Sequence, residues 1–185
     1  MDQNVLKTFK EGIFALRTRR FGTVAEIMIA ELLNMGQSGS LAFDLKDKET
    51  NEKVEVKFST VMKENDAKIS SKNVIEQCMK GNLGNRMMKS NEVGIQDFDC
   101  NIQQVKRTEF DVLYYGLFFE DKIAIFKMSS SDILSCEGYS DFQHRGNEGE
   151  GQFHINNNTY DYHMKNWFVR WLTYEELYDL FSQNA

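Results

Sequence analysis

Two apolar runs near the middle of the chain constrain the fold more than any other feature of the sequence. Residues 110–119 (FDVLYYGLFF) and 122–128 (KIAIFKM) are rich in β-branched and aromatic residues, and only Glu120 and Asp121 separate them. Apolar runs of this length and composition predict strands, and the tight acidic turn predicts that the two strands pair as a hairpin. We therefore expect a β-sheet that contains this pair.

The rest of the chain alternates between helical and extended patterns. The polar turn KETN at 48–51 separates two further expected strands, 39–47 and 53–61. Helices are expected at 3–20, roughly 22–34, 73–80, around 101–107, from a capped start at 129–134, and at 172–182. In the last helix Thr173 is the expected N-cap and Glu176 takes the capping-box position. This order predicts an α/β fold with a central mixed β-sheet flanked by helices.

The length of the chain and its cysteines bear on domain count and compartment. We expect residues 1–185 to form a single domain with a core over about 21–128. No apolar run approaches the roughly 20 residues of a membrane span, so no membrane association is expected. The three cysteines, Cys78, Cys100 and Cys136, are widely spaced and odd in number, which favours a reducing cytoplasm over a disulfide framework.

The distribution of charge leaves a nucleic-acid partner open. The net charge is −6, but residues 1–110 hold 17 basic against 16 acidic side chains, whereas residues 111–185 hold 5 against 12. The basic side chains cluster near 17–20, 80–89 and 106–107. A mixed surface with a local basic groove fits these numbers, and so does an ordinary solvated surface.

The segment VEVKFST at 54–60 alternates between apolar and polar residues. Its valines are therefore expected on one face of a strand, with Glu55 and Lys57 on the other. If KETN is a four-residue connection, the antiparallel register places Asp44 opposite Glu55. Directly opposed residues have Cβ atoms about 5 Å apart, and two carboxylates at that distance repel unless a cation lies between them. Such a pair is suited to Mg²⁺, which takes hard oxygen ligands and keeps several waters.

A plain solvent-facing hairpin is the alternative interpretation of the same residues. A one-residue slip of the register would move Asp44 to the other face of the sheet. A diagonal ion pair, either Glu55 with Lys46 or Asp44 with Lys57, would then contribute almost nothing to stability. Spacing by itself does not decide between this hairpin and a metal site.

The same residues resemble a known nuclease signature. Asp44, ten intervening residues and then Glu55-Val56-Lys57 are similar to the PD-(D/E)xK motif of restriction-endonuclease-like folds. Phe43 stands where that motif often has proline.

Two flanking segments extend this resemblance. The segment FGTVAEIMIAELLNMG at 21–36 is similar to the Gly-x-x-x-Glu helix that precedes the motif in that superfamily, and Glu26 matches its acid. FDVLYYGL resembles the later core strand, which often begins with an acid, here Asp111. The resemblance covers residues 21–60 and 110–128.

The resemblance implies Mg²⁺-dependent hydrolysis of a DNA phosphodiester that leaves 5′-phosphate and 3′-hydroxyl ends. Asp44, Glu55 and the backbone carbonyl of Val56 would hold the ion. Lys57 would position the attacking water and stabilise the phosphate during displacement. Glu26 would add a metal ligand or support the active site.

The helical segment does not by itself choose between two acids for this supporting role. Glu26 has Ile29, Ala30 and Leu33 on its own face of the helix, so it needs a partner if it is buried. Glu31 has equally apolar neighbours. Both assignments stay open.

The small size of the chain and a candidate recognition loop favour a type II restriction endonuclease acting on double-stranded DNA. Short duplex sites of this kind are mostly palindromic, which predicts a homodimer. A cognate DNA methyltransferase is implied in the cell. The alternatives are another DNA nuclease of the same fold, in repair or junction resolution, and a non-catalytic DNA-binding or protein-interaction module.

Two polar segments offer side chains for contacts with bases. They are KGNLGNRMMK at 80–89 and FQHRGNEGEGQFHINNN at 142–158, the latter within a long polar stretch at 137–166 that is the expected recognition loop. Arg suits guanine and Asn or Gln suits adenine in the major groove. The candidate DNA-binding residues are Asn82, Asn85, Arg86, Lys89, Gln143, His144, Arg145, Asn147 and Gln152. A plain surface loop is the alternative for each segment.

The second polar segment also permits two other interpretations. His144, 156–158 and His163 fit a His-Asn-His nuclease loosely. Zinc ligands are present by residue type, though without a recognised spacing: Cys136, His144, His154 and His163.

Overall fold

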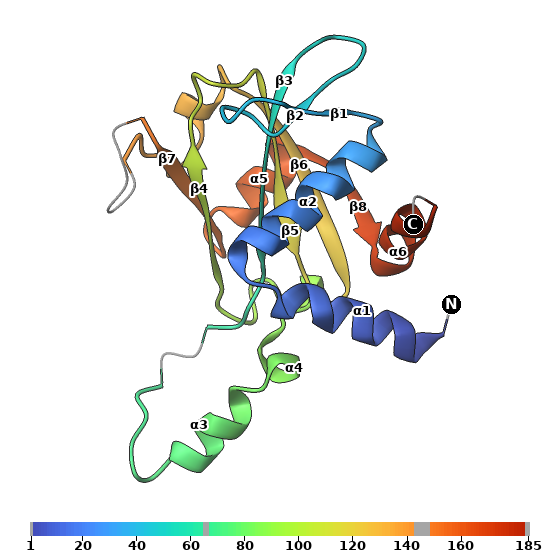
Figure 1. Ribbon diagram of the computed structural model, residues 1–185. Coiled ribbons are helices and arrows are strands. Elements are labelled where there is room, and N and C mark those ends of the chain that lie inside the picture. The colour runs from blue at the N-terminus through green and yellow to red at the C-terminus, as the bar shows by residue number, and fades with distance from the viewer. Residues whose placement is uncertain (1, 65–66, 143–148, 184–185) are drawn as a thin grey trace.

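The structure is a computed structural model that describes residues 2–64, 67–142 and 149–183. Within these residues it is a mixed α/β protein with a six-stranded sheet in the order β1-β2-β3-β5-β6-β8 and a two-stranded sheet of β4 and β7 (Figure 1). The strands are β1 (Gly36–Gln37), β2 (Leu45–Lys46), β3 (Lys53–Thr60), β4 (Asp99–Val105), β5 (Val112–Phe118), β6 (Lys122–Ser129), β7 (Gly151–Asn156) and β8 (Phe168–Thr173). The helices are α1 (Gln3–Ala15), α2 (Thr18–Leu32), α3 (Val74–Lys80), α4 (Leu83–Arg86), α5 (Tyr160–Asn166) and α6 (Tyr174–Ser182), with 3-10 turns η1 (Ser90–Glu92) and η2 (Ile133–Ser135).

The β5–β6 hairpin expected from the two apolar runs is confirmed and lies inside the main sheet. All seven residues of β5 are buried, because apolar layers cover both of its faces. Gly116 of β5 allows a close approach, since an added Cβ would lie 2.1 Å from the carbonyl oxygen of Ala124 and 2.4 Å from the ring of Phe58. The sheet is mostly antiparallel, and β3 pairs with β5 in parallel.

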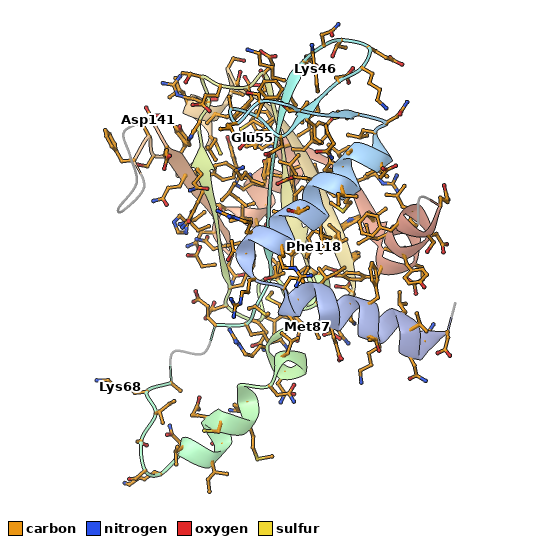
Figure 2. All side chains as sticks on the ribbon, viewed as in Figure 1. Lys46, Glu55, Lys68, Met87, Phe118 and Asp141 are labelled. Carbon is orange, nitrogen blue, oxygen red and sulfur yellow. The ribbon has the colours of Figure 1, made fainter. Side chains whose placement is uncertain are left out.

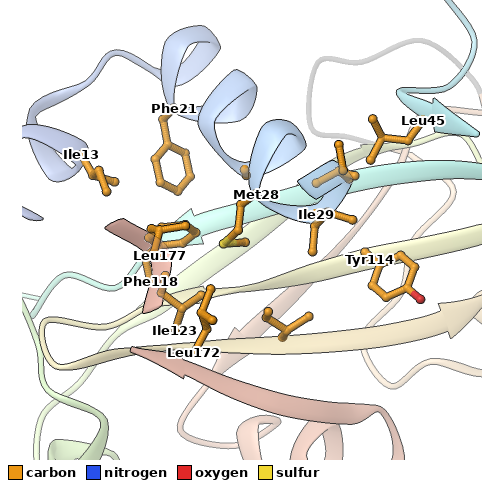
Figure 3. Packing of buried hydrophobic residues seen from close by; sticks show 14 of the residues in the cluster. Ile13, Phe21, Met28, Ile29, Leu45, Tyr114, Phe118, Ile123, Leu172 and Leu177 are labelled. Atoms are coloured by element: carbon orange, nitrogen blue, oxygen red, sulfur yellow. The ribbon is translucent and has the colours of Figure 1, made fainter. Parts of the chain in front are cut away.

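Helices α1, α2 and α6 cover one face of the main sheet (Figure 1). Figure 3 shows how α2 contributes Phe21 and Met28 to this core, above Phe118 of β5. The rings of Phe21 and Phe118 meet edge to face with centroids 5.0 Å apart. The apolar face of β3, with Val54 and Val56, belongs to the same core, as its alternation predicts.

The small β4–β7 sheet and α5 cover the opposite face of the main sheet. Alternate residues of the two strands point into this second core, among them Ile102, Phe153 and Ile155, which are all buried. Since Glu55 and Lys57 alternate with the valines of β3, they lie on this side of the sheet. Two layers therefore meet at β3, and its polar residues face the β4–β7 side.

The register expected for the first hairpin is confirmed. Leu45 pairs with Val54 and Lys46 with Lys53, which is the register that sets Asp44 opposite Glu55. The backbone N–H of Asp44 also donates to the carbonyl of Val54 at 3.0 Å.

Several expected element boundaries are wrong. The helix expected at 3–20 ends at Ala15, because Leu16 and Arg17 are extended, and α2 begins at Thr18. This break lets both helices direct apolar side chains into one core, which a straight helix cannot do. The strand expected at 39–47 is reduced to β2, and the helix expected around 101–107 is the strand β4.

The long loop expected at 137–166 is also partly wrong. The stretch contains β7 and α5, because alternate apolar residues from Phe153 onward pack into the second core. The capped helix expected at 129–134 is only the turn η2. Strand β8, between α5 and the last helix, was not predicted from the sequence. The last helix, expected at 172–182, spans Tyr174–Ser182 and has the expected capping box of Thr173 and Glu176.

No helix among the described residues is long and apolar enough to cross a membrane.

Candidate active site

Three side chains of the first hairpin meet at one point. Asp44 directly precedes β2, and Glu55 and Lys57 lie on β3. The Lys57 ammonium contacts Glu55 Oε1 and lies 3.6 Å from Asp44 Oδ2. Figure 2 labels Glu55 on β3, close to the hairpin that carries Lys46. The structure therefore brings together the three residues of the expected motif, and the lysine cation offsets the repulsion between the two acids.

Asp44 lies beside the part of β3 that has no partner strand on its β2 side. Because β2 pairs only with Lys53 and Val54, the edge of β3 beyond these residues has no neighbour on that side. The Asp44 carboxylate takes the place of the missing strand and accepts a 2.9 Å hydrogen bond from the N–H of Val56. A strand residue directs its N–H and C=O toward the same edge, so the Val56 carbonyl faces this side as well.

The carboxyl group of Glu55 is buried, and this dominates its protonation. Glu55 is only 8 % exposed. Burial raises its pKa to about 7, with Asp44 adding to the rise and Lys57 opposing it. A cation that replaced the proton would remove the reason for this elevated pKa.

Lys57 remains a cation in these surroundings. Burial lowers the pKa of its ammonium, but the neighbouring charges of Glu55 and Asp44 outweigh burial and set the pKa above its ordinary value. A lysine with a raised pKa donates hydrogen bonds and does not act as a base at neutral pH.

Glu26 is the helical acid that faces this group. It lies on α2, half-buried, and its pKa is raised by burial and then by the charge of Asp44, against the effect of Lys57. Glu31 is exposed and lines a different cavity, of about 790 Å³, between α1 and α2. The structure thus places Glu26 within electrostatic reach of Lys57 and Asp44, and Glu31 at the other cavity.

A cavity of about 430 Å³ adjoins Lys57 at the open edge of β3. It lies between α2, β3 and β4 and is lined by Thr18, Arg19, Phe21, Gly22, Thr23, Glu26, Val56, Lys57, Phe58, Asn101, Ile102, Gln103 and Gln104. The sequence did not predict that β4 lines this cavity, because the local pattern around 101–107 gave no sign of a strand.

The donor set around Lys57 fits Mg²⁺ better than a soft metal. In the part of the chain that the structure describes, no three His, Cys, Asp or Glu side chains group closely enough to hold a metal by themselves. Two carboxylates and a backbone carbonyl remain, from Asp44, Glu55 and Val56. Mg²⁺ is usually bound through one or two carboxylates, with waters and substrate phosphates completing its shell.

Asp111, the acid that begins the later strand of the resemblance, has a structural contact. Its Oδ2 accepts a 2.8 Å hydrogen bond from the backbone N–H of Lys53. Its own N–H donates to the carbonyl of Lys53 at 2.9 Å. Asp111 therefore fastens the start of β5 to the start of β3 and helps to hold the motif strand in register.

The expected base-reading residues are only partly placed. Gln143, His144, Arg145 and Asn147 lie outside the described residues. Asn82 accepts from the N–H of Gly84 and Asn85 donates to the carbonyl of Met79, so both amides are used within their own turn. Arg86 and Lys89 are exposed. Gln152 lies on β7 and accepts a 3.0 Å hydrogen bond from Asn101 of β4.

The histidines of the zinc and His-Asn-His interpretations do not come together among the described residues. His163 is fully buried beside Tyr115, with its Nδ1 2.9 Å from the phenol oxygen, and burial lowers its pKa to about 4. His154 pairs instead with Asp99 at 2.8 Å. Cys136 and these two histidines form no metal-binding group among the described residues, and His144 lies outside them.

Comparisons with protein-family models, with curated proteins and with solved structures gave no match to this chain.

Proposed function

We propose that this protein is a Mg²⁺-dependent DNA endonuclease with a restriction-endonuclease-like fold, of the type II class that cuts at a short duplex site. The observation that carries the proposal is the meeting of Asp44, Glu55 and Lys57 at the open edge of β3. A solvent-facing ion pair explains neither the burial of Glu55 nor the cavity lined by Lys57. A phosphodiester with its metal ion needs both a pair of hard oxygen ligands and room to approach them.

Each residue takes a distinct role in this proposal. Asp44, Glu55 and the carbonyl of Val56 would hold the ion. The chemistry that Mg²⁺ supplies when bound is activation of a water and neutralisation of negative charge on the phosphate. Lys57, as a cation, would donate hydrogen bonds to the attacking water and to a phosphate oxygen. Glu26 would favour the charged form of Lys57, since its own charge raises the pKa of that ammonium.

The fold supports the proposal through the position of the motif. The acid-x-lysine strand β3 lies between an antiparallel partner, β2, and a parallel one, β5, in a sheet with helices on one face. The same arrangement leaves the catalytic edge of β3 open beyond Val54. A homodimer acting on a palindromic site, a cytoplasmic location and a cognate methyltransferase complete the proposal.

Digestion of a plasmid of known sequence tests the proposal. We expect discrete fragments with 5′-phosphate ends in the presence of Mg²⁺ and none with EDTA. Lys57→Ala should lower the cleavage rate by about 10²–10³-fold, because a donor to the transition state is lost, while binding to DNA persists. Lys165→Ala, on the exposed side of α5, is the matched control and should cleave like the wild type.

The other outcomes separate the alternatives. Random degradation or nicking at branched structures would indicate another nuclease of this fold. Binding without cleavage under all metal conditions would indicate a non-catalytic module. Full activity of Lys57→Ala would remove the central assignment.

A further inference from the structure

The two-stranded sheet of β4 and β7 presents a polar face that the proposed chemistry does not use. Its inner face, with Ile102, Phe153 and Ile155, is buried in the second core. Its outer face, called here the ribbon face, consists mainly of six residues. They are Asn101, Gln103, Gln104, Gln152, His154 and Asn156.

The ribbon face is composed of amides rather than of charged side chains. The carboxylate of Asp99, at the start of β4 on the same face, is occupied by His154 Nδ1 at 2.8 Å and by Asn156 at 3.4 Å. An antiparallel sheet with one solvated face needs polar residues there, but lysine, glutamate and threonine serve that purpose equally well. Each amide instead carries both a donor and an acceptor, which is the requirement for reading a pattern of hydrogen-bonding groups.

The backbone of β4 directs two of these amides outward in succession. The register of the β4–β7 pair shifts between Ile102 and Val105, and Gln104 has a φ of 57°. The extra residue of this bulge leaves both Gln103 and Gln104 exposed. Across the ribbon, Asn101 donates to Gln152 Oε1. A carbonyl oxygen has two lone pairs, so Gln152 keeps one acceptor position as well as its NH₂ donor.

The ribbon face and Lys57 border one cavity. Asn101, Gln103 and Gln104 line the same space of about 430 Å³ as Lys57 and Glu26. A DNA backbone whose phosphate lay at Lys57 would therefore bring the adjacent groove to β4. The major groove of B-DNA is wide enough to admit a two-stranded β-ribbon.

From this placement we infer that the β4–β7 ribbon enters the major groove and reads base edges, and that its amides select adenine. Asn and Gln bind the N6 and N7 groups of adenine in a bidentate manner, which no other base pattern in the major groove satisfies. The inference rests on the proposed function, since it needs DNA held at Lys57. It assigns base recognition to Gln103 and Gln152 rather than to the polar segment at 80–89.

Two experiments test the ribbon. In the first, a library of duplexes with random sequence is digested with Mg²⁺ by the wild type, Gln103→Ala and Gln152→Ala, and the ends are sequenced. Gln103 is the cleaner site, because its side chain is exposed and makes no hydrogen bond within the described residues, so its truncation leaves the fold intact. The control is Gln3→Ala, an exposed amide on α1. In the second, 7-deazaadenine replaces each preferred adenine of one cleaved duplex.

The expected result is a loss of base preference at one position without loss of cleavage elsewhere. Gln103→Ala should reduce the preference for adenine by about 5- to 150-fold, which corresponds to about 1–3 kcal/mol for one bidentate contact. The 7-deazaadenine at that position should slow the wild type and Gln3→Ala, and have no further effect on Gln103→Ala.

Failure of this inference and failure of the proposed function give different results. If Gln103→Ala and Gln152→Ala cleave with unchanged base preference and unchanged sensitivity to 7-deazaadenine, the ribbon does not read bases, and the nuclease assignment stands. If the wild type cleaves without any preference, the ribbon does not read bases and the type II assignment is wrong, while the nuclease assignment stands. If the wild type neither binds nor cleaves DNA, both conclusions are wrong.

Discussion

The substitution Glu55→Gln removes a buried charge and keeps nearly the same shape, so it measures what the acid does to the metal-free protein. Burial raises the pKa of Glu55 from an ordinary value of 4.5 to about 7 in spite of the neighbouring Lys57. Ionised Glu55 is therefore less stable in the folded chain than in the unfolded chain. A buried acid that lowers the stability of the fold when it is ionised is expected where its charge binds a ligand.

The size of this cost follows from the pKa. The difference between 4.5 and about 7, at about 1.36 kcal/mol per pKa unit, corresponds to roughly 3 kcal/mol. Because the folded-state pKa of this acid is raised, its contribution to stability is fully present below pH 4.5. It is lost as the pH rises through about 7. The wild type should therefore lose stability from this group between about pH 4.5 and 7, and Glu55→Gln should not.

Chemical and thermal unfolding at pH 5 and pH 8 measure the effect. At pH 8 without metal we expect Glu55→Gln to be more stable than the wild type by up to roughly 3 kcal/mol, or about 6–12 °C in Tm. At pH 5 the two should differ little. Millimolar Mg²⁺ should stabilise the wild type at pH 8 and leave the variant unchanged, while cleavage by the variant is lost. Glu49→Gln, in the exposed hairpin turn, is the matched control and should follow the wild type.

The opposite sign would refute this reasoning. If Glu55 and Lys57 form a structural ion pair, removing one partner leaves an uncompensated cation, which costs about 3–5 kcal/mol. A variant that is less stable at pH 8, with no response of the wild type to Mg²⁺, would identify the pair as structural.

Three further substitutions test the fold around the site. Burial lowers the pKa of His163 to about 4, so the wild type should lose roughly 3 kcal/mol of stability as the pH falls from about 6.5 to 4. His163→Phe should abolish this loss. An unchanged acid dependence of urea unfolding in the variant would contradict the prediction. Gly116→Ala should destabilise by about 3 kcal/mol or more, since its Cβ would meet the Ala124 carbonyl at 2.1 Å, and a normal Tm would refute the contact. Thr173→Ala should cost about 1 kcal/mol through the lost cap of α6, and Thr173→Asn should restore most of it.

The sequence was informative wherever a local pattern carried the structural signal. The β5–β6 hairpin followed from two apolar runs and a two-residue turn, and the capping box of the last helix from Thr173 and Glu176. The register of Asp44 against Glu55 followed from the length of the KETN turn. Each of these features depends on residues within fewer than twenty positions of one another.

The expectations that were wrong depend on partners far away in the chain. Strand β4 contains Asn101, Gln103 and Gln104, and only its pairing with β7, some fifty residues later, makes it extended. The break between α1 and α2 likewise arises because both helices pack on one core. No local propensity encodes either event, because tertiary packing overrides weak local preferences.

For the candidate site, the sequence by itself determined the residue types and the hairpin that sets Asp44 against Glu55. Only the tertiary structure decided that Glu26, and not Glu31, faces this group, that Glu55 is buried, and that β4 forms a wall of the cavity. The physical reason is that spacing within a hairpin is fixed by covalent geometry and hydrogen bonding over a few residues. Burial and the facing of separate layers arise only when segments distant in sequence exclude water together.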